Sequence, residues 1–188
     1  MNLMISEIAS RLMPAAAHAD ATVDTIFYAT GECGLGLLLV ARSVSGVCAI
    51  LIGTGDDELE ADLAARFPEA KLVANEAVVH DDLTKVIRFV DKPAAGLHLS
   101  LDMRGTSFQH RVWEKLRAIP VGRTVTYTEL GRWISPLASA RVIARACAAN
   151  PIALAIPCHR VVRIDGDPAG YAWGIERKRE LIRREARP

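Results

Sequence analysis

Four residues near the C-terminus carry the groups best suited to covalent chemistry. Pro157-Cys158-His159-Arg160 places a thiol beside an imidazole, directly after the apolar run 152–156. A thiol is a nucleophile once ionised, and a neighbouring imidazole or basic group can lower its pKa from about 8.5 towards neutrality. A buried cysteine without chemistry is the general alternative, because free cysteines are among the most buried residues. The cluster favours a nucleophile that a strand over 152–156 delivers into a cleft.

The charge of the chain is divided unequally between its halves. Residues 1–104 contain 8 Lys/Arg and 15 Asp/Glu, whereas residues 105–188 contain 15 Lys/Arg and 7 Asp/Glu, so the net charge is only +1. This asymmetry indicates a polyanionic partner for the basic half. A solvated basic face is the alternative interpretation, but the motifs of the basic half favour a polyanionic partner.

Composition narrows the class of protein. A chain of 188 residues with 51% hydrophobic content can bury a core in one large domain or two small ones. No stretch approaches the roughly 20 apolar residues of a membrane span. Residues 1–19 end like a signal peptide, but Glu7 and Arg11 interrupt the apolar stretch that a signal peptide needs. Residues 1–21 are therefore expected to be a cytoplasmic leader or linker. The four cysteines lack paired zinc spacing, which predicts free thiols in a reducing compartment and no metal site; a disulfide pair is the alternative that the sequence leaves open.

The first half reads as a small α/β unit over residues 22–103. Glycine-bounded aliphatic runs predict strands over 22–29, 37–42 and 47–52, and amphipathic patterns predict helices over 57–67 and 81–90. Apolar residues alternate with polar ones over 97–103, which predicts a further, half-buried strand.

The second half is predicted to be mostly helical. Capping boxes beginning at Thr106 and Thr126 open helices that reach about Ile119 and Ile134. Ser135 is expected to cap a third helix, with Pro136 at its first position and its end near Ala149. A final helix is expected over 175–186. The two short helices joined by a tight turn are a helix-turn-helix pattern.

The second helix of this pair indicates DNA distortion. Most of its side chains are small, and Arg141 and Arg145 stand out. Reading bases in the major groove requires large contact side chains, whereas a small-residue helix can lie against a groove floor with an arginine inserted into the stack. Tight core packing is the alternative. A reactive thiol beyond such a pair implies chemistry on a flipped-out nucleotide, and no cofactor motif is present, so the protein itself would be the acceptor.

These residues resemble the O6-alkylguanine-DNA alkyltransferases, or methylated-DNA-protein-cysteine methyltransferases. The resemblance covers 104–186 and is carried by Phe108-Gln-x-x-Val-Trp113, Gly122-x-Thr-Val-x-Tyr127, Ala140-Arg141, Ala149-Asn-Pro151, Ile156-Pro-Cys-His-Arg-Val-Val162 and Gly170-Tyr-x-Trp-Gly174. Residues 22–103 resemble more loosely the ribonuclease-H-like N-terminal domain of the alkyltransferase part of bacterial adaptive-response proteins. The implied fold is α/β, with that domain followed by a mostly helical DNA-binding and alkyl-acceptor domain at 104–188.

The resemblance implies a chemical role for five residues. Cys158 would accept the alkyl group of O6-methylguanine, and of O4-methylthymine, in one irreversible turnover without a cofactor. His159 would take the thiol proton through a water, oriented by Glu185 in preference to Glu176 or Glu180. Tyr127 would donate to the guanine ring nitrogen, its alternative being a core tyrosine. Asn150 would brace the turn before the site, its alternative being a helix cap.

The resemblance also implies a DNA face and a base pocket. Arg141 would enter the base stack, with Ser139 and Ala140 beside it and Arg145 on a phosphate. Tyr171, Ala172 and backbone groups near Val161 would line the pocket, where Ala172 lacks the side-chain contact of many relatives and Pro168 precedes the pocket loop. The implied partner is double-stranded DNA containing O6-alkylguanine, bound by a cytoplasmic monomer.

Three other functions fit parts of the pattern. A lesion-binding module without transfer would not require Cys158. A cysteine hydrolase would use Cys158 and His159 but leave the basic helix pair unexplained. A helix-turn-helix regulator would read unmodified sequences strongly, whereas weak sequence preference with a marked salt dependence is expected here.

Overall fold

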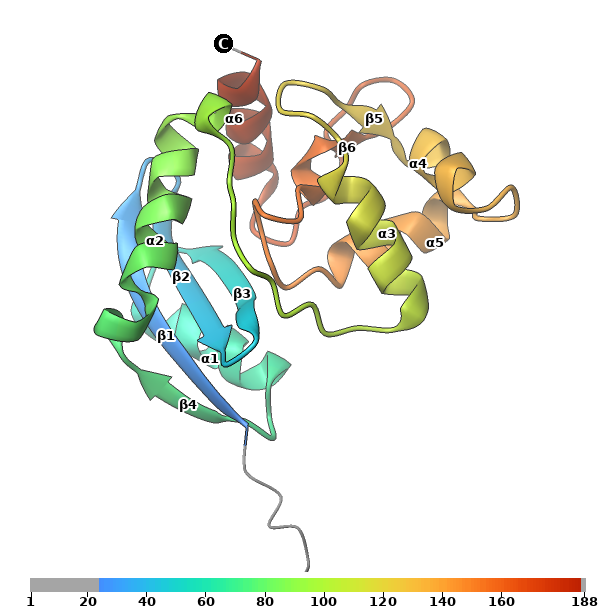
Figure 1. Ribbon diagram of the computed structural model, residues 1–188. Helices are drawn as coiled ribbons and strands as arrows, with labels where there is room; N and C mark the ends of the chain where they lie inside the picture. Colours follow the sequence, from blue (N-terminus) through green and yellow to red (C-terminus); the bar gives the residue numbers. More distant parts are fainter. Residues whose placement is uncertain (1–23, 187–188) are drawn as a thin grey trace, which may run out of the picture.

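The computed structural model describes residues 24–186, which form a mixed α/β fold with one main sheet and a largely helical second half (Figure 1). The sheet has the strand order β3-β2-β1-β4. Neighbours pair antiparallel from β1 to β3, and β4 pairs parallel to β1. Its strands are β1 (Thr25–Cys33), β2 (Gly36–Ser43), β3 (Gly46–Gly53) and β4 (Lys71–Ala74).

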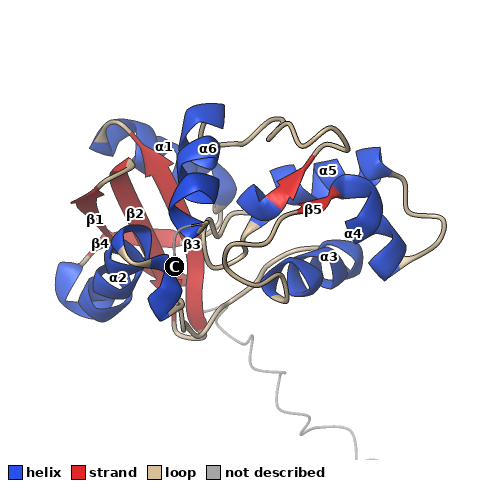
Figure 2. Ribbon diagram, turned by 90° about the horizontal axis from the view of Figure 1, so that it is seen from above, coloured by secondary structure: helices blue, strands red, loops and turns tan. Residues whose placement is uncertain are grey.

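Two helices cover opposite faces of this sheet. Gly31, Leu38 and Ile52 are partners across three strands and therefore share a face. A Cβ atom at Gly31 would contact Leu83 and Ile87 of α2 (Glu76–Asp91), whereas one at Gly53, on the other face, would contact Leu59 of α1 (Asp56–Arg66). Figure 2 shows the sheet between the two helices. The core of the first half is thus a three-layer packing.

The helical second half contains four α-helices and a two-stranded parallel ladder. They are α3 (Ser107–Arg117), β5 (Val125–Thr126), α4 (Tyr127–Ile134), α5 (Ala140–Ala148), β6 (Val161–Val162) and α6 (Ile175–Glu185), with the 3-10 turn η2 (Cys158–Arg160); a further 3-10 turn, η1 (Pro93–Ala95), follows α2 in the first half. Both predicted capping boxes are confirmed: Thr106 and Thr126 each accept from the backbone three residues on, and Gln109 and Glu129 reciprocate.

The outer edge of β3, which no other strand of the sheet pairs with, connects the two halves. Val47 bonds to Ser100 and Asp102 of the crossing segment, and Ile50 bonds to Pro151 and Ala153 just before the reactive cluster. An unpaired sheet edge carries free backbone donors and acceptors, and these short bridges satisfy part of it. The sheet therefore fixes the backbone that leads to Cys158.

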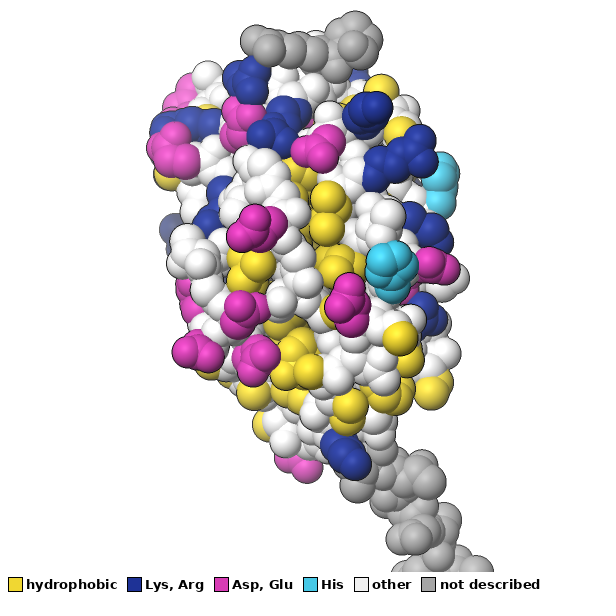
Figure 3. All heavy atoms as spheres, turned by 90° about the vertical axis from the view of Figure 1, so that its left-hand side faces the viewer, with side chains coloured by type: hydrophobic (Ala, Val, Ile, Leu, Met, Phe, Trp, Pro, Cys, Tyr) yellow, Lys and Arg dark blue, Asp and Glu magenta, His cyan; other side chains and the backbone are white. Residues whose placement is uncertain are grey.

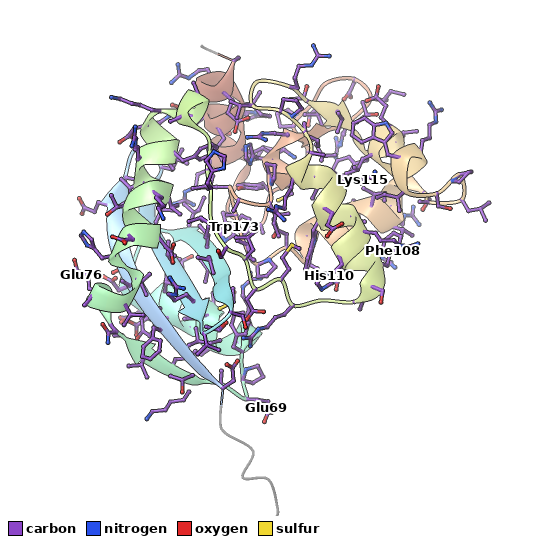
Figure 4. All side chains as sticks on the ribbon, viewed as in Figure 1. Glu69, Glu76, Phe108, His110, Lys115 and Trp173 are labelled. Carbon is purple, nitrogen blue, oxygen red and sulfur yellow. The ribbon has the colours of Figure 1, made fainter. Side chains whose placement is uncertain are left out.

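Helix α6 is held against the sheet by two arginines. Arg177 donates to the carbonyls of Leu35 and Gly53 at 2.8 and 2.9 Å, and to that of Trp173 at 2.8 Å. Arg184 donates to the carbonyls of Val90 and Gly34 at 3.1 and 3.0 Å. Figure 4 places Trp173 between the sheet and the helices of the second half. These bonds fix α6, which supplies residues to the site below.

The predicted strand over 97–103 is wrong, because this segment forms no strand, and its predicted alternation holds except at Asp102, which is half-buried. Leu97, Leu99, Leu101 and Met103 are half-buried, and the residues His98 and Ser100 are exposed. Only Leu101 forms a bridge, with Val47. The chain is extended because its apolar side chains alternate inwards, but it meets the β3 edge at a single point.

The predicted cap at Ser135 is also wrong. Ser135 ends α4, its hydroxyl accepts from Leu137 in a turn, and Ser139 caps α5 by accepting from Val142. Proline at position 136 therefore lies in the connecting turn, and α5 begins only at Ala140.

Other boundaries differ by a few residues. The strand expected over 22–29 is β1, which runs on through Gly31 to Cys33, and its expected first two residues lie outside the described range together with residues 1–21. Helix α2 begins five residues before the predicted 81, where Asn75 accepts from Val78. Strand β4 was not predicted, since four residues between two helices give little periodicity.

Charged side chains are unevenly distributed over the face that carries α2. Figure 3, which views the side of α2, shows acidic side chains spread over the middle of this face and basic ones gathered towards its upper end. Among residues 24–186, no helix has the length and apolar character needed to cross a membrane.

Candidate active site

A turn, not a strand, delivers Cys158. The predicted strand over 152–156 makes one bridge, from Ile152 to Ile50, after which Leu154 adopts a positive φ of 67°. That left-handed conformation costs a non-glycine residue about 1 kcal/mol and must be held by its surroundings. The backbone bond from Ile156 to Ile152, at 3.1 Å, closes the turn. Cys158 then opens the single turn η2.

Asn150 ties this turn together. Its Nδ2 donates to the Ile156 carbonyl at 2.8 Å and to Cys158 Sγ at 3.4 Å, and its Oδ1 accepts from Ile152 at 2.9 Å. The side chain is fully buried. Because these bonds run to the loop, Asn150 is more than a cap on the end of α5.

We expect Asn150→Ala to lower the free energy of unfolding by about 3 kcal/mol, because it leaves buried backbone groups without partners. The amide also fixes Cys158, so the rate at which a maleimide modifies this thiol should change. Urea unfolding and a thiol-modification time course measure both. Asn75→Ala, which removes only the exposed cap of α2, is the matched control and should cost about 1 kcal/mol. If both variants lost the same free energy of unfolding, Asn150 would not brace the turn before Cys158.

The Cys158 thiol is not poised as a thiolate in the resting site. It is 5% exposed, and burial raises its pKa, against the opposing effects of the Asn150 amide and the Lys178 charge. Of the two kinds of neighbour that could lower this pKa, an imidazole or a basic group, the basic Lys178 does so here, whereas the His159 ring is bonded to Glu185. Proton removal has to accompany the reaction.

His159 belongs to a buried charge network with Glu185 and Arg160. His159 Nε2 lies 2.8 Å from Glu185 Oε1, and Arg160 donates to both Glu185 oxygens at 2.8 Å and to the Ile119 carbonyl at 2.5 Å. Burial would raise the pKa of Glu185, but the bonds from His159 and Arg160 lower it to about 2. Burial lowers the pKa of His159 and favours its neutral form. Its Nδ1 has no hydrogen-bond partner among the described residues.

This network predicts how stability depends on pH. The unfolded chain would bind protons at histidine near pH 6.5 and at glutamate near pH 4.3, whereas the folded His159 and Glu185 hold lower pKa values. The unfolded state then takes up more protons in acid, so the free energy of unfolding should fall as the pH drops below about 6.5. The contribution of Glu185 is fully present above about pH 4.3 and is lost as the pH falls towards about 2. Urea unfolding over this range is the measurement, and constant stability from neutral pH to about pH 4 would contradict the network.

Lys178 is a buried cation whose charge acts on the Cys158 thiol. It is 1% exposed, and its Nζ donates to the Val161 carbonyl at 2.6 Å and lies 5.8 Å from the centre of the Tyr127 ring. Burial lowers its pKa, and the sulfurs of Cys158 and Cys147 oppose that shift. Lysine is almost never fully buried without a partner. Its charge here counteracts part of the burial cost of a thiolate at Cys158.

A pocket of about 450 Å³ opens over Cys158. Its walls come from the loops after η2 and from α5, and most of them are small or aromatic side chains. They are Tyr127, Ala144, Cys147, Ala148, Cys158, Arg163, Ala169, Gly170, Tyr171 and Ala172. Burial raises the pKa of Tyr127 to about 12, so its hydroxyl is a donor at neutral pH. Such a pocket can hold a flat heterocycle over the sulfur.

Helix α5 presents a basic face beside this pocket. Ser139, Ala140, Arg141 and Arg145 are exposed, and the arginines make no ion pair within residues 24–186. Ala144 and Ala148 of the same helix line the pocket. One helix thus joins a cationic surface to the reactive thiol. In the part of the chain that is described, no cluster of His, Cys, Asp or Glu could hold a metal ion.

Comparison with known proteins agrees with this geometry. The family model described as "6-O-methylguanine DNA methyltransferase, DNA binding domain" matches residues 107–187. A probable methylated-DNA-protein-cysteine methyltransferase of Acanthamoeba polyphaga mimivirus is 37% identical over an alignment of 136 positions, which covers 61% of this chain and 91% of that protein. The chain belongs to the O6-methylguanine-DNA methyltransferase family.

Longer and solved relatives of the family extend the similarity to the first half. The bifunctional transcriptional activator/DNA repair enzyme Ada of Escherichia coli K12 is 46% identical over 159 residues, which are 85% of this chain and 45% of that protein. The chain spans less than half the length of the first curated relatives that it matches. The crystal structure of the Mycobacterium tuberculosis O6-methylguanine methyltransferase has a TM-score of 0.66 at 29% identity, covering 86% of this chain and 93% of that one. Its complex with DNA has a TM-score of 0.65 at 28% identity and covers 86% and 92%.

The structure of this family member brings the expected site residues into two connected groups. Cys158, Tyr127, Tyr171 and Ala172 line the pocket, and His159, Glu185 and Asn150 support it from behind. Val161 is buried and contributes its carbonyl to Lys178.

Several residues of the site were not identified from the sequence. Arg160 was part of the motif but was given no role, and Lys178 resembles any exposed lysine on a helix. Cys147, Ala144 and Ala148 reach the pocket only because α5 turns its small face towards Cys158. The sequence pattern relates their small size to a DNA groove, whereas in the structure these side chains also form a wall of the pocket.

Proposed function

We propose that the protein repairs alkylated double-stranded DNA directly, by moving the alkyl group of O6-methylguanine to its own Cys158 in one irreversible turnover. Membership of the family supports this. The observation that carries it is a pocket of about 450 Å³ whose floor is Cys158 and whose rim is the basic helix α5. O4-methylthymine offers the same alkyl carbon on a smaller ring and is a second substrate.

The reaction is a displacement at the alkyl carbon. The proton of Cys158 passes through a water to His159, whose neutral ring Glu185 orients and supports. The sulfur then forms a bond to the methyl carbon while the carbon–oxygen bond to the guanine breaks, and its electron pair stays on the base. Tyr127 donates a hydrogen bond to the ring nitrogen and stabilises that charge. No group in the mechanism breaks the carbon–sulfur bond of the resulting thioether, so the protein acts once.

The DNA is held so that the base leaves the stack. Arg141 enters the space of the flipped nucleotide, Ser139 and Ala140 lie against the groove, and Arg145 contacts a phosphate. The exposure of these residues, three at the start of α5 and Arg145 in its last turn, supports this assignment. Tyr171, Ala172 and the backbone near Val161 contact the base.

We also propose that the chain folds into two domains. Residues 22–103 would be a ribonuclease-H-like domain, and residues 104–188 a DNA-binding and alkyl-acceptor domain in which α4 and α5 form a helix-turn-helix. The protein would act as a cytoplasmic monomer. Sedimentation in the presence and absence of DNA tests the oligomeric state.

A titration with methylated duplex tests the function. Increasing protein should remove one O6-methyl group per protein molecule, so the plateau equals the protein concentration and further incubation adds nothing. Continued loss beyond one methyl per protein would indicate a hydrolase. Tight binding with no loss would indicate a lesion-binding module.

A further inference from the structure

The β5–β6 ladder places an arginine beside the pocket tyrosine. Val125 pairs with Val161 and Thr126 with Val162 in parallel register, so the residues that follow, Tyr127 and Arg163, leave the ladder side by side. Both line the pocket over Cys158. Tyr127 is half-buried and Arg163 is exposed, so the arginine lies nearer the solvent.

The Arg163 guanidinium has no partner in the described part of the chain. Its backbone is fixed, because its N–H donates to Asp167 at 2.8 Å and its carbonyl accepts from Gly166 at 3.0 Å. The carboxylates of the same turn face backbone amides: Asp165 accepts from Asp167 at 3.0 Å and Asp167 from Ala169 at 2.7 Å. By contrast Arg160, Arg177 and Arg184 are all engaged. Arg163 is the one cationic side chain among the residues that line the pocket.

The positive charge of Arg163 lies close enough to the pocket to affect Tyr127. Burial raises the pKa of Tyr127, and Arg163 opposes that rise. A base that enters the pocket leaves its sugar and phosphates at the rim, because the DNA backbone must continue on both sides. The anion that reaches an exposed cation at the rim is therefore a phosphodiester oxygen. A guanidinium matches it with two parallel N–H donors.

We propose that Arg163 binds a backbone phosphate flanking the flipped nucleotide and so holds that nucleotide in the pocket. This role rests on the proposed function, since it presumes a flipped base over Cys158. It differs from the roles of Arg141 and Arg145, which lie on α5 and meet the duplex outside the pocket.

Two substrates separate this role from an effect on the base. Methyl transfer is measured from a duplex containing O6-methylguanine and from the free nucleobase O6-methylguanine, which has no phosphate. Arg163→Ala should lower the second-order rate constant for the duplex by roughly tenfold or more, as loss of a charged hydrogen bond does. The rate with the free nucleobase should remain within about twofold. Arg163→Lys should recover part of the duplex rate, because it restores the charge without the planar pair of donors.

A control variant shows whether the loss of any exposed arginine affects the two rates. Arg88→Ala removes an exposed arginine of α2 and should leave both rates unchanged. An equal loss on duplex and free nucleobase would overturn the proposal in favour of an effect on Tyr127 or the ring, and no loss on the duplex would overturn it outright.

Binding separates a failure of the phosphate contact from a failure of transfer. In a Cys158→Ala background, anisotropy of a labelled methylated duplex is followed against salt concentration. Arg163→Ala should reduce the slope of log K against log salt by about 1, the value for one phosphate contact. An unchanged slope would contradict the phosphate contact even if wild-type protein transfers no methyl group.

Discussion

Replacing Glu185 with Gln should lower the free energy of unfolding by about 3 kcal/mol, because the change leaves the buried Arg160 cation without its carboxylate. Arg160 is 6% exposed and donates to both Glu185 oxygens. The amide can still accept from His159 but no longer carries the charge that supports a proton on the ring. The methyl-transfer rate should fall by roughly a hundredfold, the scale of a lost general base.

The matched control for this variant is Glu176→Gln. Glu176 lies on the same helix and pairs with Arg179 at 2.6 Å, but its side chain is 79% exposed. Exposed pairs contribute about 0–1 kcal/mol, so its stability and rate should stay near those of the wild type. Urea unfolding and single-turnover transfer assays measure both variants. If the two were indistinguishable, the network behind Cys158 would have no part in stability or transfer.

Replacing Cys158 with Ser should abolish methyl transfer while leaving the fold and DNA binding intact. The two side chains have nearly the same shape, so Asn150 can still donate to the new atom. A hydroxyl is far harder to ionise than a thiol and is a poorer nucleophile for an alkyl carbon. Transfer in a single-turnover assay should fall below detection, and the affinity for methylated duplex should change by less than about threefold.

Cys147→Ser is the control within the same pocket. Cys147 also lines the pocket, but burial raises its pKa well above the ordinary value. It has no contact with Asn150 of the kind that Cys158 makes, so transfer should be retained. If Cys158→Ser kept the transfer activity, or Cys147→Ser lost it, Cys158 would not be the acceptor of the methyl group.

The chemistry-bearing residues could be predicted because they lie in short motifs. Cys158 and His159 are adjacent, and Glu185 was assigned by matching the last helix, where the bond to His159 is in fact found. The capping boxes at Thr106 and Thr126 were equally readable, because each is complete within four residues.

What could not be predicted depends on contacts distant in sequence. The segment 152–156 reads as a strand, and only the β3 edge and the left-handed Leu154 turn it away. The pKa of Cys158 depends on burial, which a motif does not report. Lys178 is buried because Val161 and Tyr127 come to it from other elements. Arg163 gains its place beside Tyr127 from a two-residue ladder too short to leave a periodic pattern.

The most direct test is a peptide mass map after wild-type protein has reacted with a duplex containing O6-methylguanine. We predict that the peptide containing Cys158 gains the mass of one methyl group, that the gain is stoichiometric, and that the peptides with Cys33, Cys48 and Cys147 remain unmodified. An unmodified Cys158 peptide from folded protein that binds the duplex would contradict direct alkyl transfer to this residue.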